Sequence, residues 1–486
     1  MGEVCLFRAD ASPAIGAGHV MRCLAFAETL QWAGWTCRFA TNELASAAAP
    51  ALMSGGHDVR VMTNQADVAT LARDARVAVI DHYGLDAALE RAIAAEGARV
   101  VVFDDLADRL HASDILLDSS PQRVADDYRG KVPADCRLLL GARYAIVRRM
   151  WRQNAAAARQ RHAKGEAVRR IVVSMGATDP SNATLRVIRA LSGLPKSIEV
   201  DALLGSAAPH REAVTAALGA GMRLHVDPEN LVSLFADADL AIGAAGSTSF
   251  ERAILGLPSI LIPVADNQRF IVQAFGAAKA AEVLSADALD RPAEFVAQVR
   301  QFADDGDKRA EMSQAAARMI DGRGTLRLLA AVAGTYIGAN GATIELRAAE
   351  PEDEDWLFEL QLQPATRRYA LDRNLPKPEG HKRWLASTLA DPERLLGIVV
   401  VTGEPAGMIR LDRISSKPVT FQVSIAIDER KQRLGIGRAA LELARGIAPA
   451  AEFVATVLPE NRASRALFSA AGYRAEGDNR FRRRAA

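Results

Sequence analysis

The sequence predicts an α/β protein with two domains built on parallel sheets, followed by a third, smaller α/β domain. Short, continuous apolar runs alternate with helix-like stretches, as in parallel sheets that helices cover on both faces. The runs stand at 4–7, 77–80, 99–105, 169–176, 239–246 and 259–264. A length of 486 residues also exceeds what one hydrophobic core usually serves.

Two changes in composition mark the predicted domain boundaries. The stretch AAAARQRHAKGEAVRR is polar and basic and precedes the strand-like run at 169–176. The stretch YIGANGATIELRAAEPEDED contains two glycines before another strand starts. We therefore predict domains at 1–160, 161–337 and 342–486. The first two carry the parallel-sheet pattern, and the third begins a different one.

Composition narrows the classes of partner. The chain carries 60 Lys and Arg against 59 Asp and Glu, so it lacks the basic field that general binding of nucleic acid or an anionic membrane needs. We find neither a signal-like start nor a run of about 18 apolar residues. The four cysteines form no CxxC pair or metal-ligand spacing, which favours buried free thiols. We expect a cytoplasmic protein that acts on a small molecule, without nucleic acid, membrane insertion or a metal; protein partners stay unknown.

The first candidate site lies where the strand at 4–7 passes into a helix. The stretch RADASPAIGAGHV places Gly16, Gly18 and His19 in this turn, where small residues let a ligand approach the backbone. The stretch is not a P-loop, and Met21 replaces the third glycine of the dinucleotide fingerprint. His19 is a candidate base at the carboxyl end of the sheet, and a helix-capping role is the alternative.

Polar clusters also end two further predicted strands of this domain. Asp81, His82 and Tyr83 follow one strand, and Asp104 and Asp105 follow the next. Such groups are common as turn and cap residues. Three polar clusters on one rim nevertheless favour a ligand cleft.

The second domain contains a similar pattern. SMGATDPSNAT places Gly176 behind a strand, and GAAGSTSFERAILGLPSILIPVADNQ combines a small-residue turn, a helix with Glu251 and a strand that ends before Asn267 and Gln268. Small residues let a diphosphate reach backbone N–H groups, and a carboxylate one turn into the helix can accept both ribose hydroxyls. An ordinary helix with an N-terminal glutamate is the alternative.

The ordered series of these motifs over residues 1–335 resembles the UDP-sugar hydrolases of pseudaminic acid biosynthesis, two-domain relatives of the GT-B glycosyltransferases. The resemblance implies hydrolysis of UDP-2,4-diacetamido-2,4,6-trideoxy-β-L-altropyranose to UDP and the free sugar, with His19 at the family's catalytic histidine. It implies that Gly246, Ser247 and Thr248 hold the diphosphate and Glu251 the ribose, and it implies no metal. Further candidates for catalysis or for the sugar-nucleotide site are Asp10, His82, Asn267, Gln268, Gly16, Gly18 and Gly176.

The third segment carries a glycine loop of another kind. QRLGIG follows the strand-like run FQVSIAI and opens a helix, so successive backbone N–H groups can hold a pyrophosphate without a lysine. The ending LPENRASRALFSAAGY places polar residues around a short amphipathic helix. These features resemble the GNAT acetyltransferases over residues 343–486, which implies acetyl-CoA as cosubstrate.

The resemblance to GNAT enzymes also implies site residues. Those for acetyl-CoA are Gln432, Arg433, Gly435, Gly437, Asn461 and Ser464. Tyr473 is a candidate acid for the departing thiolate, and a core aromatic residue is the alternative. Fusion to the hydrolase-like region suggests the 4-amine of the UDP-sugar as acceptor, and protein N-terminal acetylation is the alternative.

Three functional classes therefore compete. The first is a bifunctional enzyme that carries out two consecutive steps toward a nonulosonic acid for surface glycans such as flagellin. The second is a GT-B glycosyltransferase with an attached acetyltransferase, which would need an acceptor groove. The third is a nucleotide-sugar sensor, which would bind a UDP-sugar and release no UDP.

Overall fold

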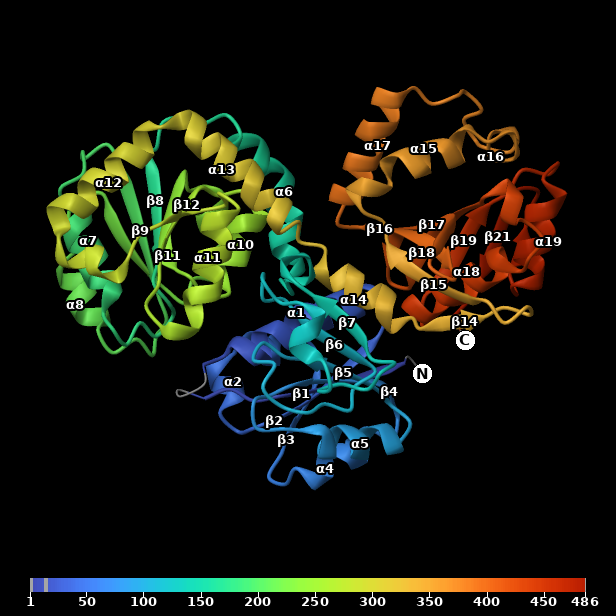
Figure 1. The fold of residues 1–486 in the computed structure, drawn as a ribbon, viewed down its shortest axis with the longest axis horizontal. Helices are drawn as coiled ribbons and strands as arrows, with labels where there is room; N and C mark the ends of the chain where they lie inside the picture. Colours follow the sequence, from blue (N-terminus) through green and yellow to red (C-terminus); the bar gives the residue numbers. More distant parts are fainter. Residues whose placement is uncertain (1–2, 13–15, 486) are drawn as a thin grey trace. The chain divides into compact units, whose positions relative to one another are not determined.

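The structure is a computed structural model of the chain that describes residues 3–12 and 16–485, apart from the side chains of Ala47, Ala48, Ala66 and Asn267. The described residues form three sheets (Figure 1). The chain divides into two compact units: unit 1 comprises 1–117, 128–139 and 325–486, and unit 2 comprises 118–127 and 140–324. The predicted fold class, two parallel-sheet domains followed by a smaller α/β domain, is confirmed.

The amino-terminal sheet has the strand order β3-β2-β1-β4-β5-β6-β7, and β1 to β6 pair in parallel. Its strands are β1 (Val4–Ala9), β2 (Thr36–Thr41), β3 (Asp58–Val61), β4 (Ala75–Asp81), β5 (Arg99–Phe103), β6 (Ile115–Asp118) and β7 (Arg137–Leu140). Its helices are α1 (Gly18–Trp32), α2 (Ala45–Ala48), α3 (Ala51–Ser54), α4 (Ala66–Leu71) and α5 (Ala87–Ala95), with 3-10 turns η1 (Ala125–Tyr128) and η2 (Ala142–Tyr144).

The strands of this sheet bury both faces. Leu6 and Phe7 are neighbours in β1 and therefore point to opposite faces, yet neither is more than 1% exposed. Phe7 stacks on Phe39 of β2 with ring centroids 4.7 Å apart. Continuous apolar runs are the expected signature of such strands, which is why the run at 4–7 predicted β1 correctly.

Unit 2 contains a parallel sheet in the order β10-β9-β8-β11-β12-β13. Its strands are β8 (Arg170–Ser174), β9 (Glu199–Leu204), β10 (Met222–Val226), β11 (Leu240–Ala244), β12 (Ser259–Ile262) and β13 (Glu282–Val283). Its helices are α6 (Arg149–His162), α7 (Ala183–Leu191), α8 (Arg211–Ala216), α9 (Leu231–Ala236), α10 (Thr248–Ile254), α11 (Arg269–Ala277), α12 (Pro292–Asp304) and α13 (Gly306–Met319), with 3-10 turns η3 (Asp266–Gln268) and η4 (Ala286–Asp290).

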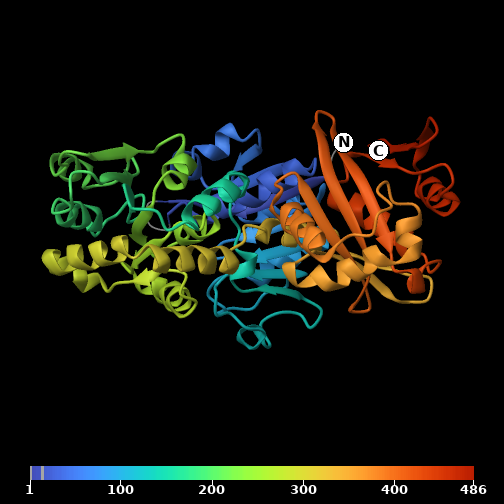
Figure 2. The same ribbon diagram turned by 90° about the horizontal axis from the view of Figure 1, so that it is seen from above.

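Helices flank both faces of this sheet (Figures 1 and 2). Alternate strand residues enter separate cores, because successive side chains of a strand point to opposite faces. Ala241 of β11 packs in a cluster with Trp151 of α6 and Phe235 of α9. Its neighbour Ile242 packs in a second cluster with Phe295 of α12.

The third sheet belongs to unit 1 and has the order β14-β15-β16-β17-β18-β19-β21-β20. Its strands are β14 (Thr335–Ile337), β15 (Thr343–Ala348), β16 (Arg394–Val401), β17 (Glu404–Ser416), β18 (Val419–Ile427), β19 (Glu452–Thr456), β20 (Arg474–Glu476) and β21 (Arg480–Arg483). The helices are α14 (Gly324–Val332), α15 (Glu354–Leu362), α16 (Pro364–Arg368), α17 (Pro378–Ala390), α18 (Ile436–Ile447) and α19 (Arg462–Ala470), with 3-10 turns η5 (Pro351–Asp353) and η6 (Glu429–Lys431). Antiparallel pairing dominates, but β18 and β19 are parallel. The edge strand β14 precedes residue 342, so the sheet begins earlier in the chain than the sequence pattern of the third domain.

Trp32, the last residue of α1, and Trp35, which follows the helix, join the two sheets of unit 1. Trp32 donates from Nε1 to Oε2 of Glu393 at 2.9 Å, and its ring packs edge to face on Phe421 of β18 at 5.0 Å between centroids. Trp35 donates from Nε1 to the main-chain oxygen of Ile447 at 2.8 Å. The acetyltransferase-like sheet and the amino-terminal sheet therefore share a packed contact.

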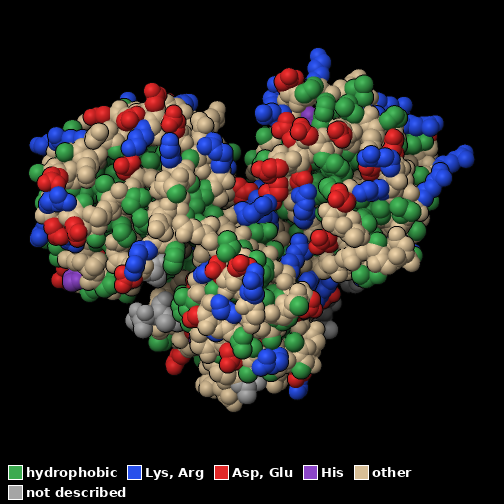
Figure 3. Space-filling view, viewed as in Figure 1, with side chains coloured by type: hydrophobic (Ala, Val, Ile, Leu, Met, Phe, Trp, Pro, Cys, Tyr) green, Lys and Arg blue, Asp and Glu red, His purple; other side chains and the backbone are tan. Residues whose placement is uncertain are grey.

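The distribution of surface charge and the state of the cysteines can be compared with what the composition predicted. Basic and acidic side chains are interspersed over the face drawn in Figure 3. All four cysteines are free; three are buried as expected, but Cys136 is partly exposed. Among the residues that the structure describes, none of the helices has the length and apolar character that crossing a membrane requires.

Candidate functional site

The first candidate site lies at the carboxyl edge of the amino-terminal sheet, where β1, β4 and β5 end and α1 begins. Asp10 follows β1, His82 and Tyr83 follow β4, and Asp105 follows β5. His19 is the second residue of α1. Because parallel neighbours end at the same edge, the fold brings these side chains together.

Asp10 is held by three groups. The Arg8 guanidinium pairs with both oxygens of its carboxylate, the backbone N–H of Asn42 donates to Oδ1 at 2.8 Å, and Nε2 of His82 lies 3.2 Å from Oδ2. Burial favours the neutral carboxyl, but hydrogen bonds from His82 and Arg8 outweigh it and hold the pKa of Asp10 well below its usual range. Asp10 is therefore a fixed carboxylate near neutral pH.

The hydrogen bonds of His82 define its tautomer. The backbone N–H of Gly84 donates to Nδ1 of His82 at 2.9 Å, so Nδ1 is an acceptor. Nε2 then carries the hydrogen and donates it to Asp10. Since both ring nitrogens are engaged, His82 is suited to orienting the Asp10 carboxylate.

Arg22 connects α1 to the ends of β4 and β5. It donates to both oxygens of Asp81 at 2.6 and 2.8 Å, and its Nη1 lies 3.3 Å from Oδ2 of Asp105. The Tyr83 hydroxyl donates to the same Asp105 oxygen at 3.3 Å. Burial, with the charge of Asp105, raises the pKa of Tyr83 to about 12. This network fixes the first turns of α1 and thereby the position of His19.

His19 itself is 7% exposed, and its ring packs edge to face on that of Tyr83 with centroids 4.5 Å apart. Its Nδ1 atom is buried and has no hydrogen-bond partner among the described residues. Burial lowers the pKa of His19, although the charge of Asp81 opposes this. His19 is therefore an uncharged imidazole near neutral pH, and such a ring can accept a proton.

Gly16 and Gly18 precede this histidine. Gly16 has a φ of +73°, in the region that favours glycine. A Cβ at either position would meet none of the described atoms within 4 Å. The backbone of Gly16 pairs with that of Ser12, because the Gly16 N–H donates to Ser12 at 2.7 Å and the Ser12 N–H donates to Gly16 at 3.3 Å. Residues 13–15 of the predicted turn lie outside the described residues.

Arg8 and Arg22 were not predicted as parts of the site. Arg8 is a charged residue inside an otherwise apolar strand, and Arg22 stands about one helical turn after His19. Buried charges need partners, so an arginine in a buried run is the signal that could have found them.

The second candidate site lies at the carboxyl edge of the unit 2 sheet. Gly176 follows β8, the turn 243–249 joins β11 to α10, and Gln268 follows β12. These three strands are neighbours, so the structure brings the predicted segments to one edge. A Cβ on Gly246 would meet no described atom within 4 Å, and Ser247 is exposed.

Glu251 lies in the first turn of α10, which Thr248 begins. Burial raises the pKa of Glu251 to about 7, while the charges of Arg252 and Arg148 and a hydrogen bond from Trp151 oppose the rise. The Glu251 carboxyl therefore exchanges between its ionised and neutral forms near neutral pH.

The two polar residues predicted after β12 have different outcomes. Oε1 of Gln268 accepts a hydrogen bond from the backbone N–H of Val264 at 2.9 Å, which closes the turn after β12. The side chain of Asn267 lies outside the described residues. Roles for both in orienting water or sugar stay predictions.

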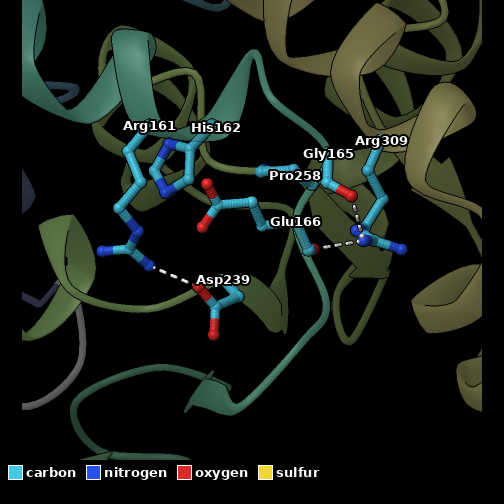
Figure 4. A pocket seen from close by; sticks show the side chains of 7 residues that line it. All are labelled: Arg161, His162, Gly165, Glu166, Asp239, Pro258 and Arg309. Carbon is cyan, nitrogen blue, oxygen red and sulfur yellow. Dashed lines mark hydrogen bonds and ion pairs between the residues drawn. The ribbon is translucent and has the colours of Figure 1, made fainter.

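A small pocket of unit 2 lies at the opposite edge of the sheet (Figure 4). Asp239 directly precedes β11 and accepts from Arg161 at 2.6 Å, and Arg309 donates to the main-chain oxygens of Gly165 and Glu166. The pocket's polar groups thus fasten α6 to the residue before β11, and α13 to the loop before β8. We assign this pocket a structural role.

The third candidate site lies where β18 and β19 separate. Their parallel pairing covers only Thr420–Gln422 and Glu452–Val454, while β18 continues to Ile427 along its other neighbour, β17. The later part of β18 therefore diverges from β19. Backbone N–H and C=O groups at such a divergence can bond an extended ligand.

The predicted pyrophosphate loop follows β18 and begins α18. Arg433 and Gly435 have φ of +64° and +79°. A Cβ on Gly435 would meet no described atom within 4 Å, whereas one on Gly437 would lie 3.0 Å from the side chain of Leu467. Gly435 thus lies beside open space, and Gly437 allows α18 and α19 to pack closely.

Three other predicted acetyltransferase residues have defined contacts. Gln432 donates from Nε2 to the main-chain oxygen of Ile427 at 3.2 Å. Asn461 caps α19, because its Oδ1 accepts from the backbone N–H of Ser464 at 3.0 Å. The first bond orders the connection between β18 and the loop, and the second orders the start of α19.

Tyr473 has the surroundings of a core aromatic residue. It is 4% exposed and packs edge to face on Phe468 with centroids 5.0 Å apart. Burial raises the pKa of its hydroxyl. Its role as a catalytic acid stays a prediction.

Metal-ligating groups give no further site within the described ranges. No cluster of three or more His, Cys, Asp or Glu side chains there has the arrangement that could hold a metal ion.

Comparison with known proteins extends this description. Residues 343–474 match the acetyltransferase (GNAT) domain family, and residues 228–324 match the glycosyltransferase family 28 C-terminal domain. The chain is 28% identical over 256 residues to a UDP-2,4-diacetamido-2,4,6-trideoxy-β-L-altropyranose hydrolase of Campylobacter jejuni, covering 51% of this chain and 88% of that protein. It is 24% identical over 272 residues to the spore coat polysaccharide biosynthesis protein SpsG of Bacillus subtilis, covering 53% and 76%.

Two solved structures are similar to parts of the chain. MurG of Acinetobacter baumannii is 16% identical, with 67% of this chain and 98% of that chain covered and a TM-score of 0.47. Spermidine N-acetyltransferase of Vibrio cholerae, solved with CoA and spermine, is 18% identical, with 29% and 92% covered and a TM-score of 0.27. The matched sequence segments fit a fusion of a relative of the altropyranose hydrolase with a GNAT acetyltransferase domain.

Proposed function

We propose that the chain is a bifunctional amino-sugar enzyme. One activity transfers an acetyl group from acetyl-CoA to the 4-amine of a UDP-amino sugar. The other hydrolyses UDP-2,4-diacetamido-2,4,6-trideoxy-β-L-altropyranose to UDP and the free sugar. The similarity to the Campylobacter jejuni hydrolase and the acetyltransferase domain support this pairing.

The observation that carries the hydrolase proposal is the state of His19. A largely buried, uncharged imidazole at the carboxyl edge of the sheet has the form a general base needs. In the proposed step His19 takes a proton from water as the water oxygen bonds to C1 of the sugar. The bond between C1 and the phosphate oxygen breaks, and UDP leaves with the bonding electrons.

The other residues receive supporting roles in this proposal. Asp10, oriented by His82, accepts a hydrogen bond from water or sugar, and Gly16 and Gly18 allow close approach. The nucleotide is assigned to unit 2, with the diphosphate at Gly246, Ser247 and Thr248, the ribose at Glu251, and the neighbouring groups at Gly176, Asn267 and Gln268.

For acetyl transfer, the loop of Gln432, Arg433, Gly435 and Gly437 is assigned to the pyrophosphate of acetyl-CoA. Asn461 and Ser464 are assigned to its pantetheine arm, and Tyr473 to the thiolate. Acetyl-CoA supplies the acetyl group when bound. The open space at Gly435 and the divergence of β18 from β19 support the assignment.

Mass spectrometry of products tests the proposal. Candidate UDP-amino sugars are incubated with the full chain, with and without acetyl-CoA, and UDP, free sugar and acetylated nucleotide are identified. His19→Ala is expected to lower UDP release about 10²- to 10⁴-fold while acetylation continues. His57→Ala is the matched control, because burial also lowers the pKa of His57, yet its ring contacts Phe39 and Gln31.

Three outcomes would contradict the proposed function. Unchanged UDP release by the His19→Ala variant would show that His19 is not the general base. Sugar transfer to an added acceptor in place of water makes the chain a glycosyltransferase. Binding without any product makes it a sensor.

A further inference from the structure

Arg252 is a buried cation that the motifs did not single out. It is 1% exposed, and it follows Glu251 in α10. Its Nη2 donates to the main-chain oxygen of Ala244 at 2.7 Å and lies 3.3 Å from Oγ of Ser249. Its Nε and Nη1 atoms are buried and have no hydrogen-bond partner among the described residues. The guanidinium therefore holds both sides of the turn that joins β11 to α10.

Gly243 shows where the guanidinium lies. A Cβ at this position would be 1.8 Å from Nη1 of Arg252 and 2.6 Å from the main-chain oxygen of Ser174. The cation thus occupies the space that a side chain at 243 would fill. Gly246, three residues later, has no described atom within 4 Å of its Cβ position. The guanidinium therefore fills the space beside Gly243 in β11, whereas the space beside Gly246 in the following turn holds no described atom.

The charge of Arg252 is incompletely balanced. Its neighbouring carboxyl is Glu251, and burial of that carboxyl keeps it partly neutral near pH 7. Burial also lowers the pKa of Arg252 to about 10, which reflects the cost of a charged guanidinium in this interior. In an interior of low dielectric, the Arg252 guanidinium attracts an anion bound at the neighbouring turn much more strongly than it would in water.

We propose that Arg252 is a positioning residue for the nucleotide diphosphate: it holds Ala244 at the end of β11 and Ser249 in α10 in place, and its charge attracts the phosphate groups bound at the turn between them. This inference rests on the proposed binding of UDP by unit 2. In this proposal, the absence of a side chain at Gly243 leaves room for the guanidinium, and its absence at Gly246 leaves room for the ligand. Arg252 contacts the turn and not the nucleotide, so removing its charge affects phosphate affinity more than nucleoside affinity.

The experiment measures affinities of the full chain for UDP and for uridine by calorimetry. Arg252→Gln keeps a donor and removes the charge, and it is expected to weaken UDP binding by about tenfold or more while uridine changes by less than about twofold. Arg252→Lys keeps the charge and is expected to stay within about threefold of the unmutated chain for UDP. Arg309→Gln is the matched control, because Arg309 is a buried arginine of unit 2 that bonds main-chain oxygens at the opposite edge.

Gly243→Ala provides the same test without changing a charge. Its Cβ must displace the guanidinium and also the main-chain oxygen of Ser174 in β8, so the ratio of UDP to uridine affinity is expected to fall at least as far as in Arg252→Gln. If Arg252→Gln does not fold, Arg252→Met, which keeps a long side chain and removes the charge, replaces it in the same comparison. Equal losses for UDP and uridine, or no loss, overturn the role of Arg252. An unmutated chain that binds no UDP overturns the proposed function as well.

Discussion

The Nε2 atom of His82 lies 3.2 Å from Oδ2 of Asp10, while Nδ1 of His82 accepts a hydrogen bond from the backbone N–H of Gly84 at 2.9 Å. The hydrogen bonds of two histidines in one site therefore differ. His82 has both nitrogens engaged, whereas His19 keeps an unbonded Nδ1. We accordingly propose that His82 orients the carboxylate and that His19 takes up the proton.

The first prediction concerns His82. His82→Leu removes the donor to Asp10 and is expected to lower kcat for UDP release about tenfold, the equivalent of a buried hydrogen bond lost at about 1–2 kcal/mol. His82→Gln keeps an amide N–H and is expected to recover most of the activity. Steady-state kinetics over a range of pH checks this. The pH profile should keep its shape, because His19 remains; loss of the acidic limb, where protonation of the base lowers the rate, would instead make His82 the base.

The second prediction concerns Glu251, whose pKa is raised to about 7. Its carboxylate accepts hydroxyl hydrogens of the ribose, and its protonated form loses part of that capacity. UDP affinity of the full chain should therefore rise with pH through about 7 and level off above it. Titration of UDP between about pH 5.5 and 8.5 measures this.

Glu251→Gln is the control, because the phosphates of UDP also titrate within this range. The difference between the unmutated chain and this variant isolates the carboxyl. A difference that is constant across the range would place the ribose away from Glu251.

Six strands of the two parallel sheets, β1, β4, β5, β8, β11 and β12, were predicted, because buried parallel strands are continuous apolar runs that need no knowledge of the partner strand. Others, such as β2 and β9, were not among the predicted runs. The rim containing Asp10, His82 and Asp105 followed from the same logic, since parallel strands end at one edge. The pairing of Arg22 with Asp81 was not predictable, because it joins residues 59 positions apart and depends on which strand lies beside α1.

Two other features also required three-dimensional packing. The sequence shows that residue 243 is a glycine, but only the structure shows a guanidinium in the space of its missing side chain. The strand β14 spans three exposed residues, too few to display an alternating pattern, so the edge of the third sheet escaped prediction.

The third prediction concerns Gly435, which has a φ of +79° beside open space. Gly435→Val is expected to raise the KM for acetyl-CoA about tenfold or more and to spare hydrolysis of an already acetylated sugar nucleotide, because the side chain blocks the loop and disfavours its dihedral angles. Gly403→Val is the matched control. Gly403 has a φ of +86° and also faces open space, but it lies in the β16–β17 turn. A similar rise in KM for both variants would mean that backbone strain alone is responsible.

The fourth prediction concerns the contact between the two sheets of unit 1. Trp35 is 4% exposed and donates to Ile447. Trp35→Ala is expected to lower the free energy of unfolding by about 3–5 kcal/mol, as for other large buried side chains. Since the contact joins two sheets, unfolding should also lose cooperativity. Calorimetry of the full chain checks both effects; Trp384→Ala, within the acetyltransferase core, is expected to destabilise without dividing the transition. An unchanged single transition in Trp35→Ala would show that other contacts couple the sheets.

The last prediction concerns the order of the two reactions. An unacetylated 4-amine is largely an ammonium ion at neutral pH and loses hydration when it enters a site shaped for an amide. Such a site also leaves its donor to the acetyl carbonyl unpaired, a polar mismatch that costs up to ~10⁴-fold in selectivity. We therefore expect the chain to hydrolyse the diacetamido nucleotide much faster than its 4-amino precursor, so that acetylation controls UDP loss. The measurement supplies the 4-amino nucleotide without acetyl-CoA, follows UDP release, and then adds acetyl-CoA. UDP should appear only after the addition, and with Gly435→Val it should appear late. Equal rates for both nucleotides would remove the ordering while leaving the two activities in place.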